Sequence, residues 1–477
     1  MAQRVLQARD AAYDRLRAGI EAIQQELHVQ PDFPAPVQAA AEQDARTSRL
    51  PDLDLTHLEF VTVDPAGAMD LDQAMHLETD GDGYVVHYAI ADVHAFVAPG
   101  DAVDVEAHAR GESLYGATTK IPLHPPVLSE GAASLLPDQV RPAFVWTIAL
   151  DADGDVTEAK VERARVRSRQ KLDYVGVQRE LGHAPPGSTL ALLEVVGTLR
   201  IAKEAERGGV SLPMPAQEID VEGDRLRLEY RAMLPVESWN AQLSLLTGFA
   251  AARLMIEGKV GVLRTLPPAP EHEVRALRRT ARALGIDWPN SMGHPEFIRS
   301  LDPSRPADAA MVVACTRLLR GAGYVSFHGQ VPDQPEHAAL ASPYAHVTAP
   351  LRRLVDRYGL EICVALCAGT EIPAWVIGGM DALPDLMRDS GRRSHAYENA
   401  VVNLVEALTL ERRVGESFAG VILEVEHDDE REGTVMVREP AVEAPVVSTQ
   451  PLPVGEDVTV TLTEADPATR KVRFTKP

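Results

Sequence analysis

Three aspartates lie within nine residues of the stretch FVTVDPAGAMDLDQA, at Asp64, Asp70 and Asp72. No Lys or Arg lies among them, so their mutual repulsion is costly unless a cation or water relieves it. Mg²⁺ typically takes a few carboxylates and leaves its other positions to water and substrate phosphate, which suits phosphodiester cleavage. The spacing therefore favours a metal-dependent phosphodiesterase, and an exposed acidic loop is the alternative that it leaves open.

A run of alternating basic residues could bind a polyanion. It lies in KVERARVRSRQK and comprises Arg163, Arg165, Arg167, Arg169 and Lys171. An extended strand places alternate residues on one face. The chain has 47 basic against 70 acidic residues and a formal net charge of −23, so nucleic acid would need a local basic surface of this kind. A solvated edge strand kept soluble by its charges is the alternative.

The elements that must position these groups predict a multi-domain α+β fold. Apolar residues recur in steps of three or four from Val5 to Leu27, which predicts a helix ending before Pro31, and residues 35–45 predict a second, shorter one. Strand-like and helical runs then mix, which favours a large α/β domain. Short strands with turn signals close the chain and predict a small β-barrel. The expected boundaries are 1–57 for a helical, helix-turn-helix-like unit, 58–413 for the α/β domain and 414–477 for the barrel.

Length and composition exclude several other classes. A chain of 477 residues with 45% hydrophobic residues can build more than one core. Three cysteines are too few for a secreted disulfide framework, and Cys363 and Cys367, four apart in an apolar helical pattern, are expected in the core. No stretch is apolar and long enough to cross a membrane, and the N-terminus mixes charges throughout, so we expect a cytoplasmic protein without a membrane partner. The segment ETDGDGY at 78–84 predicts a hairpin turn, because the remaining ligands of a calcium loop are missing.

Four landmarks in order resemble the catalytic domain of the RNase II (RNB) family of exoribonucleases. They are VTVDPAGAMDLDQA, IADVHAFVAPGD, RGESLYGATTKIPLHPPVLSEGAASLLPDQVRPA and SPYAHVTAPLRR. The terminal β segment is similar to the family's OB-fold RNA-binding domain. The first 57 or so residues are too few for paired cold-shock barrels, so the chain resembles a compact bacterial form without N-terminal cold-shock domains.

The resemblance implies processive hydrolysis of RNA from its 3′ end to nucleoside 5′-monophosphates, by water activated with Mg²⁺ or Mn²⁺. The implied partners are single-stranded RNA and also structured RNA, and no oligomer is implied. Without cold-shock barrels at the entrance, we expect duplex RNA to be approached or unwound more readily than by longer relatives.

Site residues carry over from the family one at a time. Asp64, Asp70 and Asp72 match its metal-binding aspartates, and Asp70 and Asp72 are also expected to be catalytic. Arg352 matches an arginine that contacts the scissile phosphate. The remaining matches are RNA contacts, namely Tyr115, which stacks near the 3′-terminal bases, Glu398, and Arg165, Arg167 and Arg169 of the basic strand. Each has a structural alternative: a packing aromatic for Tyr115, a solvated helix start for Arg352 and a helix-face charge for Glu398.

The sequence departs from the family in several places. Gln73 replaces an acidic residue that follows Asp72, and its amide oxygen can still ligate Mg²⁺ but brings no charge. A second stacking aromatic falls at Pro213, and glutamates usual in the family fall at Ala241 and Gln242. The segment 416–477 holds six basic against thirteen acidic residues, a poor balance for tracking a phosphate backbone.

These departures keep two alternatives open. One is a non-catalytic or attenuated RNA-binding protein of the same fold, because Gln73 weakens the metal site. The other is a metal-dependent phosphodiesterase acting on DNA or small nucleotides, for which the ribose 2′-hydroxyl would be dispensable.

Overall fold

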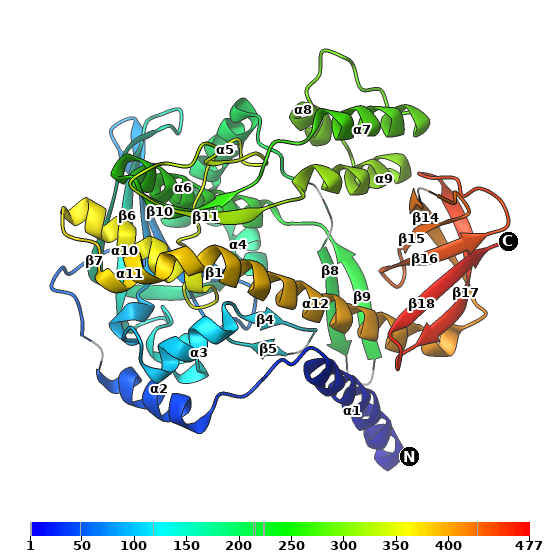
Figure 1. Cartoon of the computed structure of the whole chain (residues 1–477), viewed down its shortest axis with the longest axis horizontal. Coiled ribbons are helices and arrows are strands. Elements are labelled where there is room, and N and C mark those ends of the chain that lie inside the picture. The colour runs from blue at the N-terminus through cyan, green and yellow to red at the C-terminus, as the bar shows by residue number, and fades with distance from the viewer. Residues whose placement is uncertain are drawn as a thin grey trace.

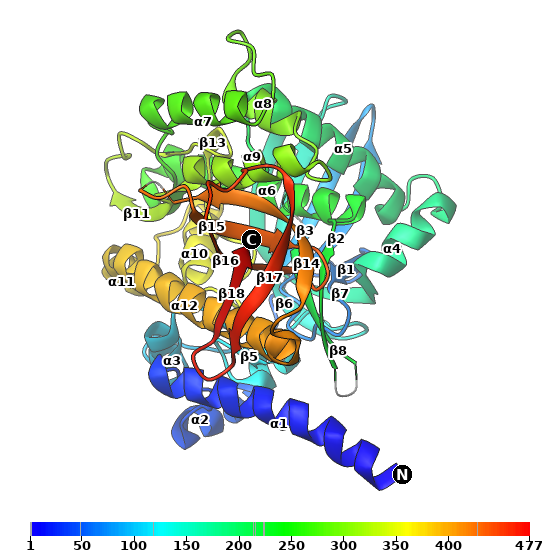
Figure 2. The same ribbon diagram turned by 90° about the vertical axis from the view of Figure 1, so that its right-hand side faces the viewer.

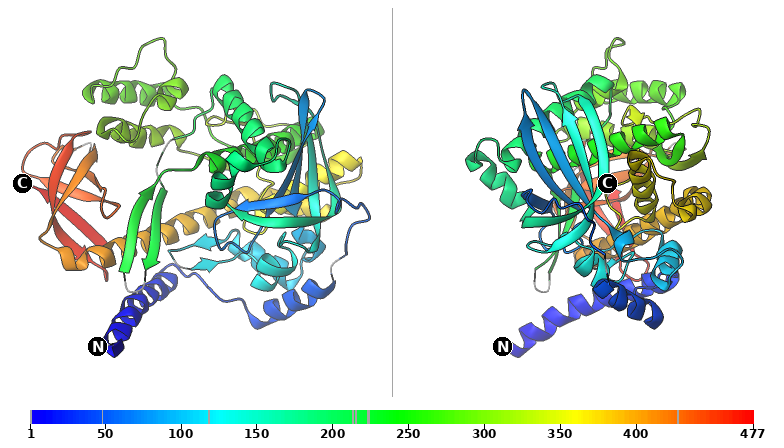
Figure 3. Two further views of the ribbon diagram at one scale, coloured as in Figure 1. Left: turned by 180° about the vertical axis from the view of Figure 1, so that it is seen from behind. Right: turned by 90° about the vertical axis from the view of Figure 1, so that its left-hand side faces the viewer.

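The computed structural model describes residues 2–47, 49–117, 119–212, 214, 216–222, 225–426 and 428–477, with the side chains of residues 2–13, 216, 220–222 and 225 left aside. The molecule is elongated, with one β-barrel towards each end and helices between and around them (Figures 1 and 3). In this described part of the chain, no helix combines the length and apolar character needed to cross a membrane.

The larger barrel follows the N-terminal helices. It is closed by β1 (Phe60–Asp64), β2 (Gln73–Asp80), β3 (Gly83–Ala91), β6 (Val140–Leu150) and β7 (Val156–Asp173), hydrogen bonded in that order. The closing pair, β1 and β7, is parallel, and the other neighbours are antiparallel. Asp80 pairs with Gly83 across the β2–β3 turn, which confirms the hairpin predicted for ETDGDGY.

Helices cover this barrel and complete its core. The helices α5 (Thr189–Arg207), α6 (Pro235–Gly258) and α10 (Leu354–Ala368) contribute buried apolar residues that pack with Trp146 and Tyr88 of the barrel. The remaining helices of the region are α3 (Ala102–Arg110), α4 (Tyr174–Glu180), α7 (Glu271–Ala283), α8 (His294–Arg299), α9 (Pro306–Cys315) and α11 (Ala374–Gly379). Helix α7 is followed by Gly285, whose positive φ of 69° suits the end of a helix.

Small antiparallel pairs link these layers. They are β4 (Leu114–Tyr115) with β5 (Lys120–Ile121), β8 (Ala216–Glu222) with β9 (Arg225–Arg231), β10 (Val260–Thr265) with β11 (Gly323–His328), and β12 (Glu336–His337) with β13 (Ser342–Pro343). The β8–β9 hairpin lies between the central domain and the C-terminal barrel (Figure 1).

The long helix α12 (Leu383–Leu410) runs from the central domain to the C-terminal barrel (Figure 1). It contacts α1, β4, β9, β17 and β18. The apolar helical pattern that starts at Ala400 is therefore the C-terminal part of a longer helix, whose N-terminal part is more polar.

The two N-terminal helices form as predicted, as α1 (Ala2–Glu26) and α2 (Ala35–Thr47). They pack on different partners. Leu16, Ile20 and Ile23 of α1 are buried in the cluster that contains Leu404 of α12, whereas α2 lies against α3. The proline-containing link at 27–34 separates the helices, so each one completes a different part of the fold instead of the two packing as one unit.

The C-terminal barrel is closed by β14 (Ser417–Val425), β15 (Glu432–Val437), β16 (Val442–Ser448), β18 (Lys471–Lys476) and β17 (Asp457–Asp466), in that order. Figure 2 looks onto it. The predicted barrel is confirmed. Strand β16 was not predicted, because Pro445 interrupts the apolar alternation of this segment.

The cysteines differ in exposure. Cys315 and Cys363 are buried, but Cys367 is exposed, so the prediction that it lies in the core is wrong. It lies in the last turn of α10, and its Sγ accepts a weak hydrogen bond of 3.5 Å from the backbone N–H of Val161.

Candidate active site

The acidic stretch forms the connection between β1 and β2. Asp64 is the last residue of β1, whose other four residues are buried, and Asp72 directly precedes β2. Pro65 and Gly67 turn the chain between them, and Gly67 has a φ of 85° that favours glycine. Two barrel strands thus fix the first and last of the three aspartates.

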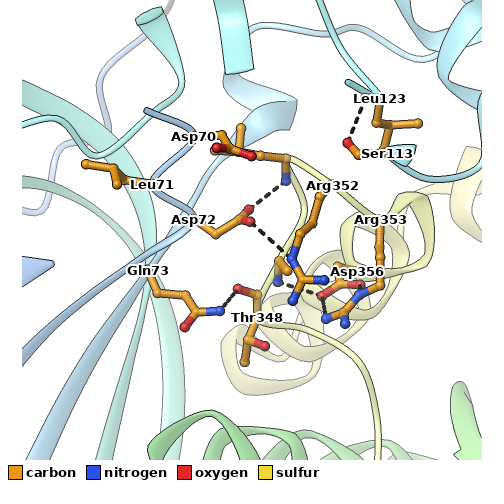
Figure 4. A network of polar contacts seen from close by, with 12 residues as sticks. Asp70, Leu71, Asp72, Gln73, Ser113, Leu123, Thr348, Arg352, Arg353 and Asp356 are labelled. Carbon is orange, nitrogen blue, oxygen red and sulfur yellow. Dashed lines mark hydrogen bonds and ion pairs between the residues drawn. The ribbon is translucent and has the colours of Figure 1, made fainter. Parts of the chain in front are cut away.

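Asp72 is the most deeply buried of the three carboxylates, with 6% of its surface exposed. Its Oδ1 accepts a hydrogen bond of 2.7 Å from the backbone N–H of Leu351, and its Oδ2 lies 3.8 Å from Nε of Arg352 (Figure 4). Burial raises the pKa of Asp72 to about 8, although Arg352 and the Leu351 amide both oppose the rise. The site therefore disfavours an uncompensated charge on this residue.

Asp64 is desolvated as well. Burial, and then the neighbouring Asp70, raise its pKa to about 6, and the charges of Lys171 and Arg352 limit the rise. Among the described residues, no hydrogen bond or ion pair engages the Asp64 carboxylate. It is therefore an oxygen donor that remains available for a cation.

Asp70 has a cationic partner that its local sequence does not reveal. Its Oδ1 lies 2.9 Å from the ammonium of Lys120, which also lies 2.7 Å from Oε1 of Glu130. Lys120 is on β5, directly opposite Tyr115 on β4, so the short hairpin directs both side chains to one side. Burial lowers the pKa of Lys120, but the hydrogen bonds that its ammonium donates to Glu130 and Asp70 outweigh this effect and raise it.

Arg352 and Arg353 follow one another but differ in environment. Arg353 donates hydrogen bonds of 2.8 and 2.9 Å to the buried carboxylate of Asp356, which also accepts 2.7 Å from the backbone N–H of Ala349. Its side chain is 14% exposed, whereas that of Arg352 is 40% exposed. The Arg353–Asp356 pair fixes the loop, and Arg352 is left facing Asp72 (Figure 4).

Gln73 is held at both ends of its amide. Its Nε2 donates a hydrogen bond of 2.6 Å to the carbonyl of Thr348, and its Oε1 accepts one of 2.5 Å from the hydroxyl of Tyr88. The amide thus connects the acidic loop to the arginine loop (Figure 4). Its role as a metal ligand remains a prediction, and its two hydrogen bonds position the loops.

One cavity of about 730 Å³ collects most of the predicted site residues. Its lining includes Asp64, Asp70, Asp72, Gln73, Tyr115 and Arg352, together with Lys120, Glu130 and Tyr174. The Tyr115 side chain is 41% exposed and so presents surface to a ligand. Lys120, Glu130 and Tyr174 were not predicted, because the fold brings them together from distant positions; the one sequence signal was a lysine close to Tyr115 in the same motif.

Other predicted residues lie outside this lining. Glu398 is exposed on α12. Arg163, Arg165 and Arg167 alternate with buried residues of β7, but the register with β1 shifts between Ser168 and Gln170 and interrupts the alternation before Lys171, so one face for all five basic side chains is not confirmed. Arg165 binds Asp54 and the carbonyls of residues 51 and 52, and Arg169 donates to the carbonyl of Thr56. Arg165 and Arg169, with Arg167 between them in the sequence, therefore border residues 51–56, which lead into β1.

Of the family departures at positions 213 and 242, only the second can be located. The position of Pro213 lies outside the described residues. Gln242 is buried on α6 and donates a hydrogen bond of 2.6 Å to Glu204, so it belongs to the packing of α6 on α5.

The donor set fits a hard divalent cation. Asp64 and Asp72 are buried carboxylates whose raised pKa values show unrelieved charge, and a cation would relieve it. Within the described ranges, no three His, Cys, Asp or Glu side chains are close enough together to hold a metal unaided. This arrangement suits Mg²⁺, which takes one or two carboxylates and completes its coordination with water and substrate phosphate.

Comparison with known proteins identifies both barrels. Residues 53–365 match the family described as RNB domain, and residues 416–476 match the RNase II-type exonuclease C-terminal S1 domain. Ribonuclease R of Escherichia coli strain K12 is 28% identical over 411 residues, which make up 80% of this chain and 49% of the relative. The chain spans about a third to three fifths of the length of the curated relatives compared with it.

Solved structures share the whole architecture. Mycoplasma genitalium RNase R in complex with ribose methylated single-stranded RNA matches with a TM-score of 0.85 at 20% identity, covering 97% of this chain and 78% of that one. Yeast Ssd1, a pseudonuclease, matches with a TM-score of 0.71 at 15% identity, covering 90% of this chain and 55% of that one. The same fold is thus found both with bound RNA and in a protein described as a pseudonuclease.

Proposed function

Because this chain belongs to the RNB-domain family, we propose that it is a processive 3′→5′ exoribonuclease that hydrolyses RNA to nucleoside 5′-monophosphates, using Mg²⁺ or Mn²⁺. The observation that carries the proposal is the single cavity in which Asp64, Asp72, Tyr115 and Arg352 meet from three separate segments. Cleavage of a terminal phosphodiester can use each kind of group in this cavity. The carboxylates can hold a cation and water, the exposed guanidinium can bind phosphate, and the exposed ring can stack on a base.

Each residue has a role that follows from its contacts. Oδ1 of Asp72 is occupied by the Leu351 amide, so Oδ2 is the oxygen that orients the attacking water. The guanidinium of Arg352 lies beside it and stabilises negative charge on the non-bridging oxygens of the phosphate. Asp64 and Asp72 would hold the cation, which supplies Lewis-acid polarisation of phosphate and water when bound.

The same arrangement defines the substrate. The face of Tyr115 can stack on any terminal base, and this favours sequence-tolerant degradation of single-stranded RNA. Structured RNA is a further proposed substrate. A stall several nucleotides before every hairpin would exclude it, and continuous degradation through a hairpin supports it.

A time course on 5′-labelled single-stranded RNA tests the proposal. With Mg²⁺, the label is expected to move down a ladder while 5′-monophosphates accumulate, and both signals disappear with EDTA and in Asp72→Asn. Asp82→Asn is the matched control, because Asp82 lies at the exposed tip of the β2–β3 hairpin. A DNA oligonucleotide of the same sequence should resist; equal cleavage would favour the phosphodiesterase of broader substrate range.

One observation favours a second candidate, a non-catalytic or attenuated RNA-binding protein. Both ends of the Gln73 amide are hydrogen bonded within the protein, so this position brings no charge to the cavity and its oxygen is already engaged by Tyr88. This candidate is supported if the protein binds RNA but does not shorten it in the presence of Mg²⁺ or of Mn²⁺.

A further inference from the structure

Lys120 places a fixed positive charge inside the cavity. Its ammonium bridges Asp70 and Glu130 at 2.9 and 2.7 Å, and its side chain is 21% exposed. Asp70 is itself only 16% exposed. The antiparallel register sets Lys120 opposite Tyr115, so the lysine is held beside the position proposed for the terminal nucleotide.

The charges of the cavity lining do not require two divalent cations. The ionisable groups along it, apart from tyrosines, are the carboxylates of Asp64, Asp70, Asp72 and Glu130 and the cations of Lys120 and Arg352. With all of them ionised, the formal charge is −2, which a single divalent cation neutralises. Gln73 adds no charge to this sum.

In-line cleavage of a phosphodiester benefits from positive charge near both the attacking and the leaving oxygen, which many enzymes supply with two metal ions about 3.5–4 Å apart. We propose that the Lys120 ammonium takes the place of one of these ions, so that the cavity binds one divalent cation, at Asp64 and Asp72, while Asp70 is held by the lysine. The inference rests on the proposed function and specifies its metal requirement.

Counting bound Mn²⁺ tests the inference directly. The full chain is titrated with Mn²⁺ while free Mn²⁺ is followed by electron paramagnetic resonance. Wild type is expected to bind one Mn²⁺ per chain, and Lys120→Met is expected to bind two, because Asp70 and Glu130 lose their cation. Lys203→Met is the matched control and should bind one Mn²⁺. Lys203 of α5 also bridges two carboxylates, those of Asp155 and Glu206, but it lies outside the cavity.

Single-turnover rates on labelled RNA give an independent measurement. At a Mn²⁺ concentration that fills only the first site, Lys120→Met is expected to lower the rate about 100-fold with RNA affinity retained, because one stabilising charge at the reacting phosphate is then missing. The rate should recover in part as the second Mn²⁺ binds. Lys120→Arg keeps the charge and should recover part of the rate. Lys120→Gln, which can still donate hydrogen bonds to Asp70 and Glu130, repeats both measurements if Lys120→Met does not fold.

The outcomes separate this inference from the proposed function. Wild type that degrades RNA with two bound Mn²⁺, or a Lys120→Met variant that keeps one Mn²⁺ and the wild-type rate, overturns the role of Lys120 alone. Wild type that neither binds Mn²⁺ nor shortens RNA overturns the proposed function as well.

Discussion

Arg352 and Arg353 are adjacent but differ in burial, so we expect their substitutions to have different effects. Arg352→Met is expected to reduce the hydrolysis rate about 100-fold or more, because no other guanidinium lines the described cavity, and to change stability little. Arg353→Met is expected to cost about 3–5 kcal/mol of folding free energy, because it leaves the buried Asp356 carboxylate unpaired. Urea unfolding and single-turnover cleavage of both variants check the pair; equal losses of stability would contradict the assignment.

Gln73 gives a second prediction at the residue scale. Gln73→Glu keeps the length of the side chain but replaces the donor facing the Thr348 carbonyl with an acceptor. We expect a loss of about 1–3 kcal/mol in the free energy of unfolding, measured with urea in EDTA at pH 7. The control is Gln170→Glu, at an exposed position on β7, which should stay within about 0.5 kcal/mol of wild type. Unchanged stability of Gln73→Glu would mean that the amide does not hold the two loops together.

At the scale of elements, α12 meets the β8–β9 hairpin and the C-terminal barrel at one buried carboxylate. Glu406 accepts a hydrogen bond of 2.9 Å from Gln217 of β8, whose Nε2 also donates to the carbonyl of Ala441 before β16. Burial raises the pKa of Glu406 from its usual 4.5 to about 7, although hydrogen bonds from Gln217 and from the backbone N–H of Glu443 oppose the rise. The folded state therefore favours the protonated carboxyl.

Because the folded state favours protonated Glu406, the free energy of unfolding should fall as the pH rises. The contribution of Glu406 to stability is fully present below about pH 4.5 and is lost as the pH rises through about 7. Relative to Glu406→Gln, wild type is expected to lose on the order of 3 kcal/mol across this range, measured by urea unfolding at each pH. Glu398→Gln, an exposed change on the same helix, should keep the wild-type profile. Parallel profiles for wild type and Glu406→Gln would contradict the prediction.

Local patterns predicted most elements but not how they pack. Most of the barrel strands, α1 and α2 follow from periodicity, because each alternates or repeats its apolar residues along its own length. The β4–β5 hairpin has strands of two residues, which is too short for any pattern, so Lys120 was not placed in the site. Likewise, the sequence shows that Cys367 follows Cys363 at a helical spacing but not that the helix face turns to solvent there.

At the scale of the whole molecule, α12 connects the central domain to the C-terminal barrel, and α1 packs against α12. Ile23→Ala is expected to cost about 2–4 kcal/mol, because Ile23 is fully buried in the cluster shared with α12 and the C-terminal barrel. Thermal unfolding of the full chain measures the loss. Ile201→Ala is the control, since Ile201 is 39% exposed on α5 and should change stability little. If Ile23→Ala unfolds like wild type, α1 does not contribute to the stability of this assembly.

The net charge is also a property of the whole molecule. The chain carries a net charge of −23, yet its candidate cavity gathers two cationic side chains among its carboxylates. For the proposed RNA substrate, the net charge supplies no long-range attraction, so binding would depend on short-range contacts in the cavity.

The exposure of Cys367 offers a practical consequence for kinetics. Burial raises the pKa of the Cys363 thiol and raises that of Cys315 to about 12, so neither forms the reactive thiolate readily, whereas Cys367 is open to solvent at the end of α10. A maleimide dye would therefore attach at one place on the unmutated protein. Energy transfer from that dye to a fluorophore at the 5′ end of an RNA would report each shortening step in real time.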